Sequence, residues 1–141
     1  MIDEMEHKLT TRHLRLDDYA AIEDISTRVY KGVATSWTKE EVGRLIDRFP
    51  EGQICIEDNG VAVAMALSLI IDFSLYGEQH SYYQIVGDGT FRAHDPEGDY
   101  LYGIDVSVDP EYQGMRLGRR LYDARKELAE NLNLKGILLG G

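Results

Sequence analysis

The sequence is poor in cysteine, in basic residues and in long apolar runs. Its single cysteine, Cys55, cannot form a disulfide within the chain. The apolar neighbours Ile54 and Ile56 favour a small buried residue over a nucleophile. No pattern of cysteine and histidine has the spacing of a zinc site. We therefore expect neither a disulfide framework nor a bound metal.

Charge and hydropathy exclude further classes of function. The chain has 15 Lys and Arg against 25 Asp and Glu, a net charge of -10, which argues against nucleic acid as the main partner because phosphate contacts drive that binding. No apolar run reaches the roughly 18 residues of a membrane span. The N-terminus is acidic, so no secretory signal is predicted, and we expect a cytoplasmic protein without a membrane partner.

The length of 141 residues fits one domain, residues 1–141. The hydrophobic fraction of 43% is sufficient for a single core. There is no internal repeat, linker or low-complexity segment that would divide the chain.

Periodicity and local signals predict strands and helices in turn. Thr38 and Glu41 form a capping box, and Asn59-Gly60 is a two-residue hairpin signal because both residues tolerate positive φ. In the strand after Gly60, large residues alternate with Ala and Ser, so one face lets another element pack closely. The predicted strands are Leu9–Leu16, Gln53–Glu57, Val61–Asp72, Tyr100–Val108 and one from Ile137; the predicted helices are Asp17–Tyr30 with Asp17 as its cap, one that follows Thr38 and stops at Pro50, and Leu117–Asn131.

The segment Phe73–Asp99 has no clear periodicity. It contains several aromatic residues, two histidines (His80 and His94), and turns rich in Gly and Asp. Connections this long are usually functional or part of an interface. Its aromatic and acidic residues either line a pocket for a cationic amine or pack against the core. A metal-binding loop at Asp95–Asp99 is a further option, although the spacing does not match an EF-hand.

The most informative segment runs from Ile104 to Leu121: a strand, a proline turn, a glycine-bearing turn and a helix. A helix that begins in such a turn directs unpaired N–H groups and the positive end of its dipole into one small space, which suits a pyrophosphate. The segment has neither the ending of a Walker A loop nor the glycine spacing of a dinucleotide fingerprint. The alternative is that Gly114 and Gly118 serve only a tight turn.

Basic residues cluster near this turn in an otherwise acidic chain. They indicate either a site for a small phosphorylated ligand or a solvated helix face. The residues are Arg116, Arg119, Arg120, Arg125 and Lys126.

This segment resembles motif A of the GNAT N-acetyltransferase superfamily, whose pattern is Val-x-Pro-x-Tyr-Arg/Gln-Gly-x-Gly-x-Gly/Ala before a long helix. The matching residues are Val108, Pro110, Tyr112, Gln113, Gly114 and Gly118, whereas Arg116 replaces the middle glycine. The resemblance implies an α/β (α+β) fold with a mixed, mainly antiparallel sheet flanked by helices. The order of elements would be β-α-α-β-β-β-α-β, without the family's final α-β-β.

The resemblance also implies roles for individual residues. Asp105 would be the general base that accepts a proton from the acceptor amine through water. The backbone of Val106 and Val108 would pair with the pantetheine arm of acetyl-CoA, the implied co-substrate. The N–H groups of the turn would hold the pyrophosphate, and Arg116 and Arg119 would reach phosphates with their side chains. The residues of that turn are Gln113, Gly114, Met115, Arg116, Leu117 and Gly118.

The resemblance leaves two functions open. One is transfer of acetyl from acetyl-CoA to an amine of a small molecule or a peptide. The other is a non-catalytic CoA-binding or regulatory module of a larger protein, since no residue matches the tyrosine that protonates the leaving thiolate in many family members. Residues Gly103–Gly141 are also similar to GNAT domains fused to a carbon–nitrogen hydrolase. We expect a further segment, or a partner chain in a homodimer, to complete the sheet, because the last strand would otherwise be an exposed edge.

Overall fold

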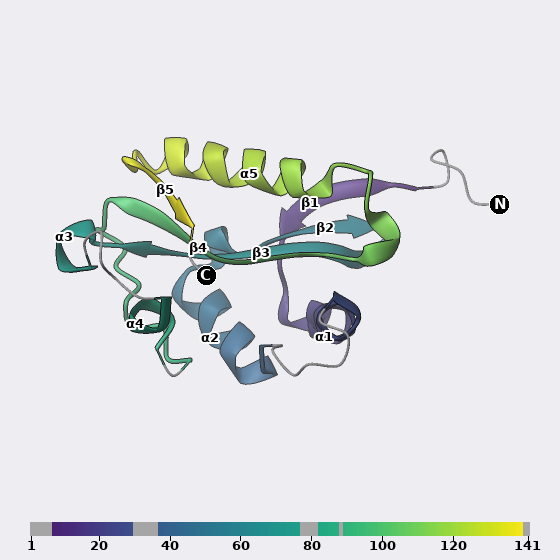
Figure 1. The fold of residues 1–141 in the computed structure, drawn as a ribbon, viewed down its shortest axis with the longest axis horizontal. Coiled ribbons are helices and arrows are strands. Elements are labelled where there is room, and N and C mark those ends of the chain that lie inside the picture. The colour runs from purple at the N-terminus through teal and green to yellow at the C-terminus, as the bar shows by residue number, and fades with distance from the viewer. Residues whose placement is uncertain (1–6, 30–36, 77–81, 88, 140–141) are drawn as a thin grey trace.

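The computed structural model describes residues 7–29, 37–76, 82–87 and 89–139. A five-stranded sheet carries α5 (Leu117–Asn131) on one face and α1 (Tyr19–Val29) and α2 (Lys39–Arg48) on the other, as Figure 1 shows. None of the helices in these ranges is long and apolar enough to cross a membrane. The three layers confirm the predicted α/β fold class.

The strands follow one another across the sheet in the same order as in the sequence. Neighbouring strands pair antiparallel, except that β4 and β5 are parallel. The strands are β1 (Leu9–His13), β2 (Ile54–Asp58), β3 (Val61–Ile71), β4 (Tyr100–Val108) and β5 (Gly136–Leu139). Asn59 and Gly60 join β2 to β3 with φ angles of 51° and 94°, which confirms the predicted hairpin.

The start of the first helix differs from the prediction. α1 begins at Tyr19, after a short 3-10 turn, and Asp17 does not cap it. The neighbouring Asp18 is buried instead and forms an ion pair of 2.8 Å with Arg12 of β1. This contact with a preceding strand has no local signature, so the capping pattern alone could not reveal it. The predicted helix end at Tyr30 lies outside the described residues.

The start of α2 matches its prediction in atomic detail. Thr38 Oγ1 accepts a hydrogen bond of 3.1 Å from the Glu41 N–H, and the Thr38 N–H donates one of 2.9 Å to Glu41 Oε1. The two bonds satisfy donors that a helix N-terminus otherwise leaves unpaired. The helix therefore begins at a defined residue, which also determines where the preceding Trp37 lies.

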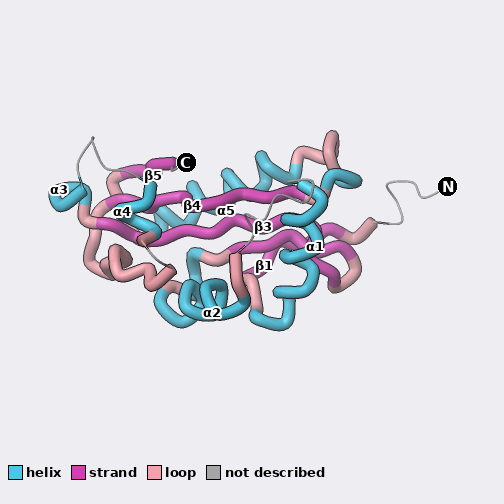
Figure 2. Tube along the Cα trace, turned by 60° about the horizontal axis from the view of Figure 1, so that its bottom comes forward, coloured by secondary structure: helices cyan, strands magenta, loops and turns pink. Residues whose placement is uncertain are grey.

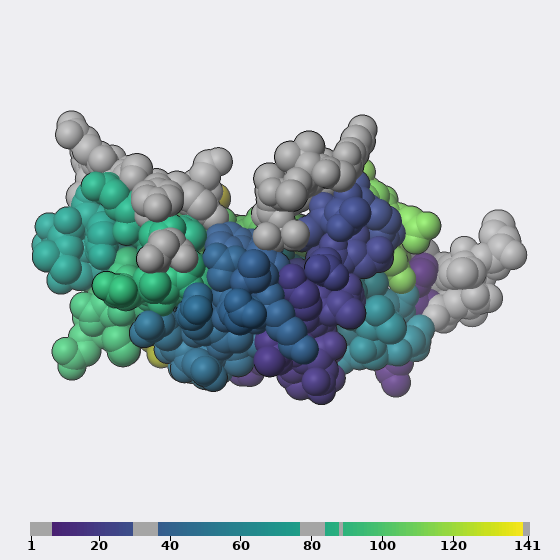
Figure 3. Space-filling view, turned by 90° about the horizontal axis from the view of Figure 1, so that it is seen from below, coloured from purple at the N-terminus to yellow at the C-terminus, as the bar shows by residue number. Residues whose placement is uncertain are grey.

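The described parts of the long connection after β3 pack against the sheet and α2. It contains two short helices, α3 (Phe73–Tyr76) and α4 (Tyr82–Val86), and Phe91 from it is fully buried. Arg44 and Arg48 of α2 donate to carbonyl groups in this segment, at 3.0 and 2.8 Å. Figure 3 shows the segment, in teal and green, beside the blue α2.

Two acidic side chains at the end of the connection accept hydrogen bonds from backbone amides. Asp95 Oδ1 accepts the Glu97 N–H at 2.9 Å, and Asp99 Oδ1 accepts the Phe73 N–H at 2.9 Å. Among the described residues no three His, Cys, Asp or Glu side chains gather as a metal site would require. Asp95 thus bonds within a local turn, whereas Asp99 bonds to the start of α3.

The two faces of β3 support two separate parts of the core. Met65 and Leu67 pack with the residues of α1 and α2, whereas Ala64 and Ala66 pack with Leu121 of α5. The small alanine side chains let α5 approach the sheet closely, as the alternation in this strand predicts. The N-terminus of α5 is thereby placed beside the end of β4.

Candidate active site

The turn between β4 and α5 has the backbone of a glycine-rich turn although one glycine is replaced. Gly114 has a φ of 90° and Arg116 a φ of 60°, and α5 begins at the next residue, Leu117. A left-handed conformation is strained for a residue with a Cβ, and glycine adopts it freely. Arg116 therefore retains the backbone geometry of the family's glycine, while its side chain is exposed to solvent.

Several amides of this turn are available to an anion. The N–H groups of Gln113 and Met115 are already used, because they donate to the carbonyls of Pro110 and Tyr112 at 3.4 and 3.3 Å. Of the six predicted pyrophosphate-binding amides, four thus have no backbone partner within the described residues. These four belong to Gly114, Arg116, Leu117 and Gly118, and the Arg119 amide in the first turn of α5 is also unpaired.

The turn offers space as well as donors. No heavy atom lies within 4 Å of where a Cβ would project from Gly114 or Gly118. The Leu117 side chain, by contrast, is buried against the sheet. Its contribution to a ligand site is therefore limited to its backbone.

Among the strands of the described residues, none pairs with the edge of β4 next to this turn. β5 pairs with β4 only from Tyr100 to Gly103, and Figure 2 shows that it runs beside just one half of β4. The Asp109 N–H donates to Val63 of β3 at 2.8 Å. Since amides alternate in direction along a strand, those of Val106 and Val108 point away from β3, towards this edge. Their placement is what pairing with an extended ligand requires.

A bulge in β4 directs the Asp105 side chain to the face of the sheet that carries α1 and α2, opposite the face covered by α5. Leu67 of β3 lies opposite Asp105 but Ser68 lies opposite Gly103, so Ile104 is an extra residue. Ile104 packs in the core beside α1 and α2, and Asp105 reaches the same side, where its Oδ2 accepts a hydrogen bond of 2.8 Å from Trp37 Nε1. Within the described parts of the chain, no group bonds to Asp105 Oδ1.

Trp37 is a site residue that the sequence analysis did not identify. Its carbonyl accepts a hydrogen bond of 2.7 Å from the Tyr19 hydroxyl, and its ring lies 5.9 Å from that of Phe91. The available signal was the position of the chain's one tryptophan immediately before a capped helix. Nothing local indicated its partner on β4.

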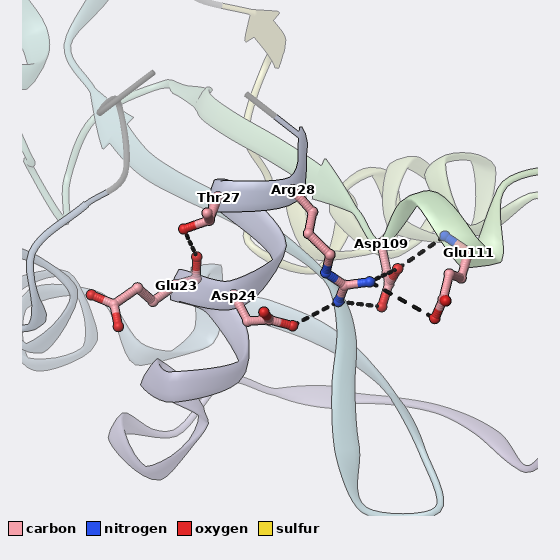
Figure 4. Close-up of polar contacts among 6 residues, drawn as sticks. All are labelled: Glu23, Asp24, Thr27, Arg28, Asp109 and Glu111. Carbon is pink, nitrogen blue, oxygen red and sulfur yellow. Dashed lines mark hydrogen bonds and ion pairs between the residues drawn. The ribbon is translucent and has the colours of Figure 1, made fainter. Parts of the chain in front are cut away.

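A partly buried ion pair joins α1 to the start of the turn. Arg28 donates to both carboxylate oxygens of Asp109 at 2.8 Å and also to Asp24 at 2.8 Å, as Figure 4 shows. Asp109 Oδ1 in addition accepts the Glu111 N–H at 2.9 Å, which caps the 3-10 turn of Pro110–Tyr112. Asp109, which precedes Pro110 of the motif, is therefore held both by α1 and by the 3-10 turn.

Tyr112 of the motif is held by the hairpin between β2 and β3. Its hydroxyl donates to Asp58, whose carboxylate also contacts His7 at 2.6 Å. The hydrogen bond from Tyr112 and, to a smaller extent, the one from the Lys8 N–H lower the pKa of Asp58 to about 2. His7 also lines a shallow cavity of about 370 Å³, with Leu9 and the turn residues Gly114, Met115 and Arg116.

The basic cluster does not act as one surface. Arg119 is exposed and lies 3.4 Å from Asp123, and Arg120 extends to Thr11 of β1 at 3.5 Å. Arg125 is 2% exposed and points into the sheet, so its inclusion in a solvated or phosphate-facing patch is wrong. Its spacing on the helix places it at the border of the apolar face, where the sequence pattern is ambiguous.

Residues 17–140 match the model of the acetyltransferase (GNAT) family. The chain belongs to the GNAT family. This confirms the resemblance inferred from the motif and from the order of elements. Two relatives from Bacillus subtilis (strain 168) are similar to it. The probable hydrolase YhcX is 39% identical over 136 residues, and the uncharacterized N-acetyltransferase YkwB is 31% identical over 105 residues.

This GNAT chain corresponds to only part of those relatives. The match with YhcX includes 96% of this chain but only 26% of the length of YhcX. The match with YkwB includes 74% of this chain and 46% of the length of YkwB. Among solved structures, the loading GNATL domain of CurA from Lyngbya majuscula superposes with a TM-score of 0.71 at 22% identity, covering 86% of this chain and 58% of that one. A ribosomal-protein-alanine N-acetyltransferase from Brucella melitensis gives 0.63 at 12% identity, covering 95% and 80%. These structures agree in fold.

Proposed function

We propose that this GNAT domain transfers an acetyl group from acetyl-CoA to a primary amine. The observation that carries the proposal is the arrangement along the outer edge of β4. Free amides at the start of α5 lie at one end of that edge, and the Asp105 carboxylate lies on the opposite face of the sheet. A thioester that enters from the side of α5 would meet an amine that approaches from the side of α1 and α2.

The residues fit acetyl-CoA by the chemistry of their donors. The free amides of Gly114 and of Arg116–Arg119, at the positive end of a 15-residue helix, suit a pyrophosphate. The outward amides of Val106 and Val108 suit the pantetheine arm. The exposed side chains of Arg116 and Arg119 would add positive charge near the pyrophosphate. The edge amides of Val106 and Val108 would also polarise the thioester carbonyl.

Transfer then needs one bond made and one broken. The amine nitrogen attacks the thioester carbon, the carbon–sulfur bond breaks, and CoA leaves as a thiolate. Asp105 accepts the proton that the amine loses, directly or through water. We assign no residue of this chain to protonation of the thiolate. Positioning of the two substrates and polarisation of the carbonyl supply most of the catalysis.

Calorimetric titration with acetyl-CoA, followed by a thiol-release assay with a panel of amines, tests the proposal. We expect binding, and release of CoA that depends on the amine and is strongly reduced in Asp105→Asn. The chain's own Cys55 is 0% exposed and burial raises its pKa to about 11, so the thiol reagent will report released CoA. Absence of heat at millimolar acetyl-CoA would contradict the proposal.

A second candidate function is a CoA-binding module that regulates a larger protein. Two observations favour it. Arg116 replaces a glycine in the turn, and the relative YhcX, of whose length the match covers 26%, is named a probable hydrolase. Binding of acetyl-CoA without turnover of any amine would support this alternative. Activity with an amine would exclude it.

We also propose that a further segment or a second copy of the chain covers β5. The Leu139 side chain at the end of β5 is 67% exposed, although it belongs to a strand that continues the sheet. An exposed strand edge with apolar side chains favours pairing with another strand. Light scattering after gel filtration tests this: a monomer with no tendency to associate would exclude the second copy.

A further inference from the structure

Arg125, in the middle of α5, inserts its guanidinium into the sheet. Its Nε donates to Ser68 Oγ at 3.1 Å, and its Nη2 donates to the carbonyls of Leu67 and Asp105 at 2.7 and 2.9 Å. The residue is 2% exposed and, among the described residues, forms no ion pair. Burial lowers its pKa to about 10. Burying a cation without a counter-ion costs free energy, and here three hydrogen bonds from the Arg125 guanidinium offset part of that cost.

The position of Arg125 coincides with the bulge in β4. Leu67 and Asp105 are the last pair before the register shifts, and Ser68 is the first residue after it. A bulge disrupts the ladder and leaves backbone groups without their usual partners. The guanidinium supplies donors to one carbonyl on each strand at this point, and thereby bonds both sides of the irregularity.

The surrounding residues leave room for Arg125 and fix its partners. A Cβ on Gly103 would lie 2.8 Å from Nη1 of Arg125, so the absence of a side chain there gives the guanidinium its space. Ser68 is held from β2 as well: Gln53 Nε2 donates to the Ser68 carbonyl at 2.9 Å, and Gln53 Oε1 accepts the Ser68 N–H at 3.0 Å. The arrangement is a built, rigid support of the bulge.

Two features of the candidate active site depend on this bulge. The extra residue Ile104 changes the alternation of amide directions along β4, so the direction of the Val106 and Val108 amides depends on it. The same extra residue allows both Ile104 and Asp105 to face α1 and α2. We propose that Arg125 is a positioning residue for acyl transfer: it maintains the bulge that aims the edge amides of β4 at the thioester and keeps Asp105 on the acceptor face. This inference rests on the proposed function.

The infrared band of acetyl-CoA labelled with ¹³C at the thioester carbonyl tests the inference without knowledge of the acceptor. In the unaltered protein, binding should shift the band to lower wavenumber, because the edge amides polarise the carbonyl. Arg125→Met should lose at least half of that shift while the Kd for CoA without an acyl group changes less than about threefold. Lys126→Met, which removes an exposed charge from the same helix, should retain the full shift.

Two further variants cover the case in which Arg125→Met does not fold. Arg125→Lys keeps a cation but not the planar fork that reaches both carbonyls, and it should lose the band shift in the same way. Gly103→Ala should displace the guanidinium and have the same effect. If these variants keep the full shift, or if CoA affinity falls together with the shift in proportion to lost stability, the inference is overturned. If the unaltered protein does not bind acetyl-CoA at all, the proposed function itself has failed.

Discussion

Trp37 Nε1 donates a hydrogen bond of 2.8 Å to Asp105 Oδ2 and so joins the entry of α2 to the middle of β4. The indole is itself held, since the Tyr19 hydroxyl donates to the Trp37 carbonyl at 2.7 Å and the Phe91 ring packs beside it. The Asp105 carboxylate is therefore fixed in one orientation. A carboxylate held in this way suits the role of general base that we propose for Asp105.

The first prediction concerns this pair. Asp105→Asn should lower kcat by about 10²- to 10⁴-fold, the usual contribution of a general base. Trp37→Phe removes only the N–H donor and keeps an aromatic ring against Phe91. It should lower kcat by about tenfold, because it releases the carboxylate without removing it, and should leave the Kd for acetyl-CoA unchanged. Steady-state kinetics with an accepted amine provide the measurement. A kcat within twofold of the unaltered protein for Asp105→Asn would exclude the base.

The ion pair between Arg28 and Asp109 should contribute to stability. Arg28→Met leaves the buried Asp109 carboxylate without its bidentate partner, and we expect a loss of about 1–3 kcal/mol in the free energy of unfolding. The value is below that of a fully buried pair because the Arg28 side chain is 35% exposed. Asp24→Asn removes the exposed partner of the same arginine and should change the free energy by less than about 0.5 kcal/mol. Urea denaturation measures both, and equal losses would contradict the assignment.

Arg116 provides a test of backbone strain in the turn. Because its φ is 60°, Arg116→Gly should give a higher free energy of unfolding than Arg116→Ala, by about 0.5–1 kcal/mol. Both variants remove the same charged side chain, so the difference isolates the Cβ. Thermal or urea unfolding of the two variants provides the comparison. An alanine variant as stable as the glycine variant would show that the turn changes its backbone when the arginine is absent.

The partly buried His94 should make stability depend on pH. Its Nδ1 accepts the Ile70 N–H at 3.1 Å and its ring stacks on Phe49 at 4.9 Å, and burial lowers the pKa of His94 in the folded protein. The unfolded chain therefore takes up a proton first, near pH 6.5. Stability should fall as the pH drops below about 6.5, by at most about 1.4 kcal/mol per pH unit, and level off below the pKa of the folded state.

Matched variants separate His94 from the other titrating groups. His94→Asn keeps an acceptor for the Ile70 N–H but does not titrate, so the fall in stability between about pH 6.5 and 5 should be reduced. His13→Asn alters an exposed histidine and should retain the fall. Urea denaturation across this range gives the slopes. Identical slopes for His94→Asn and the unaltered protein would contradict the prediction.

The features that the sequence predicted well are those with a local code. The capping box of Thr38 and Glu41, the hairpin at Asn59-Gly60 and the helix that begins at Leu117 each depend on residues that are close neighbours in the chain. Their conformations follow from hydrogen bonds and φ preferences within a few residues. The motif around these glycines also identified the family, which the match over residues 17–140 confirms.

The features that the sequence did not predict depend on contacts between distant residues. The connection Phe73–Asp99 has no repeating pattern because its structure is determined by α2 and the sheet against which it packs. Arg125 looked like part of a basic surface because its helical position is at the edge of the apolar face. Only the assembled sheet shows that the side chain turns inward, into the space left because Gly103 has no side chain.

Taken by itself, then, the sequence determined the order of the main elements and the glycine-bearing turn with its free amides, because these follow from periodicity and short-range geometry. Its resemblance to motif A indicated the GNAT family. The tertiary structure alone decided two things: which face of the sheet Asp105 occupies, and that the Arg125 side chain bonds to both strands at the bulge. A register shift is a property of two paired strands, and neither strand contains the information separately.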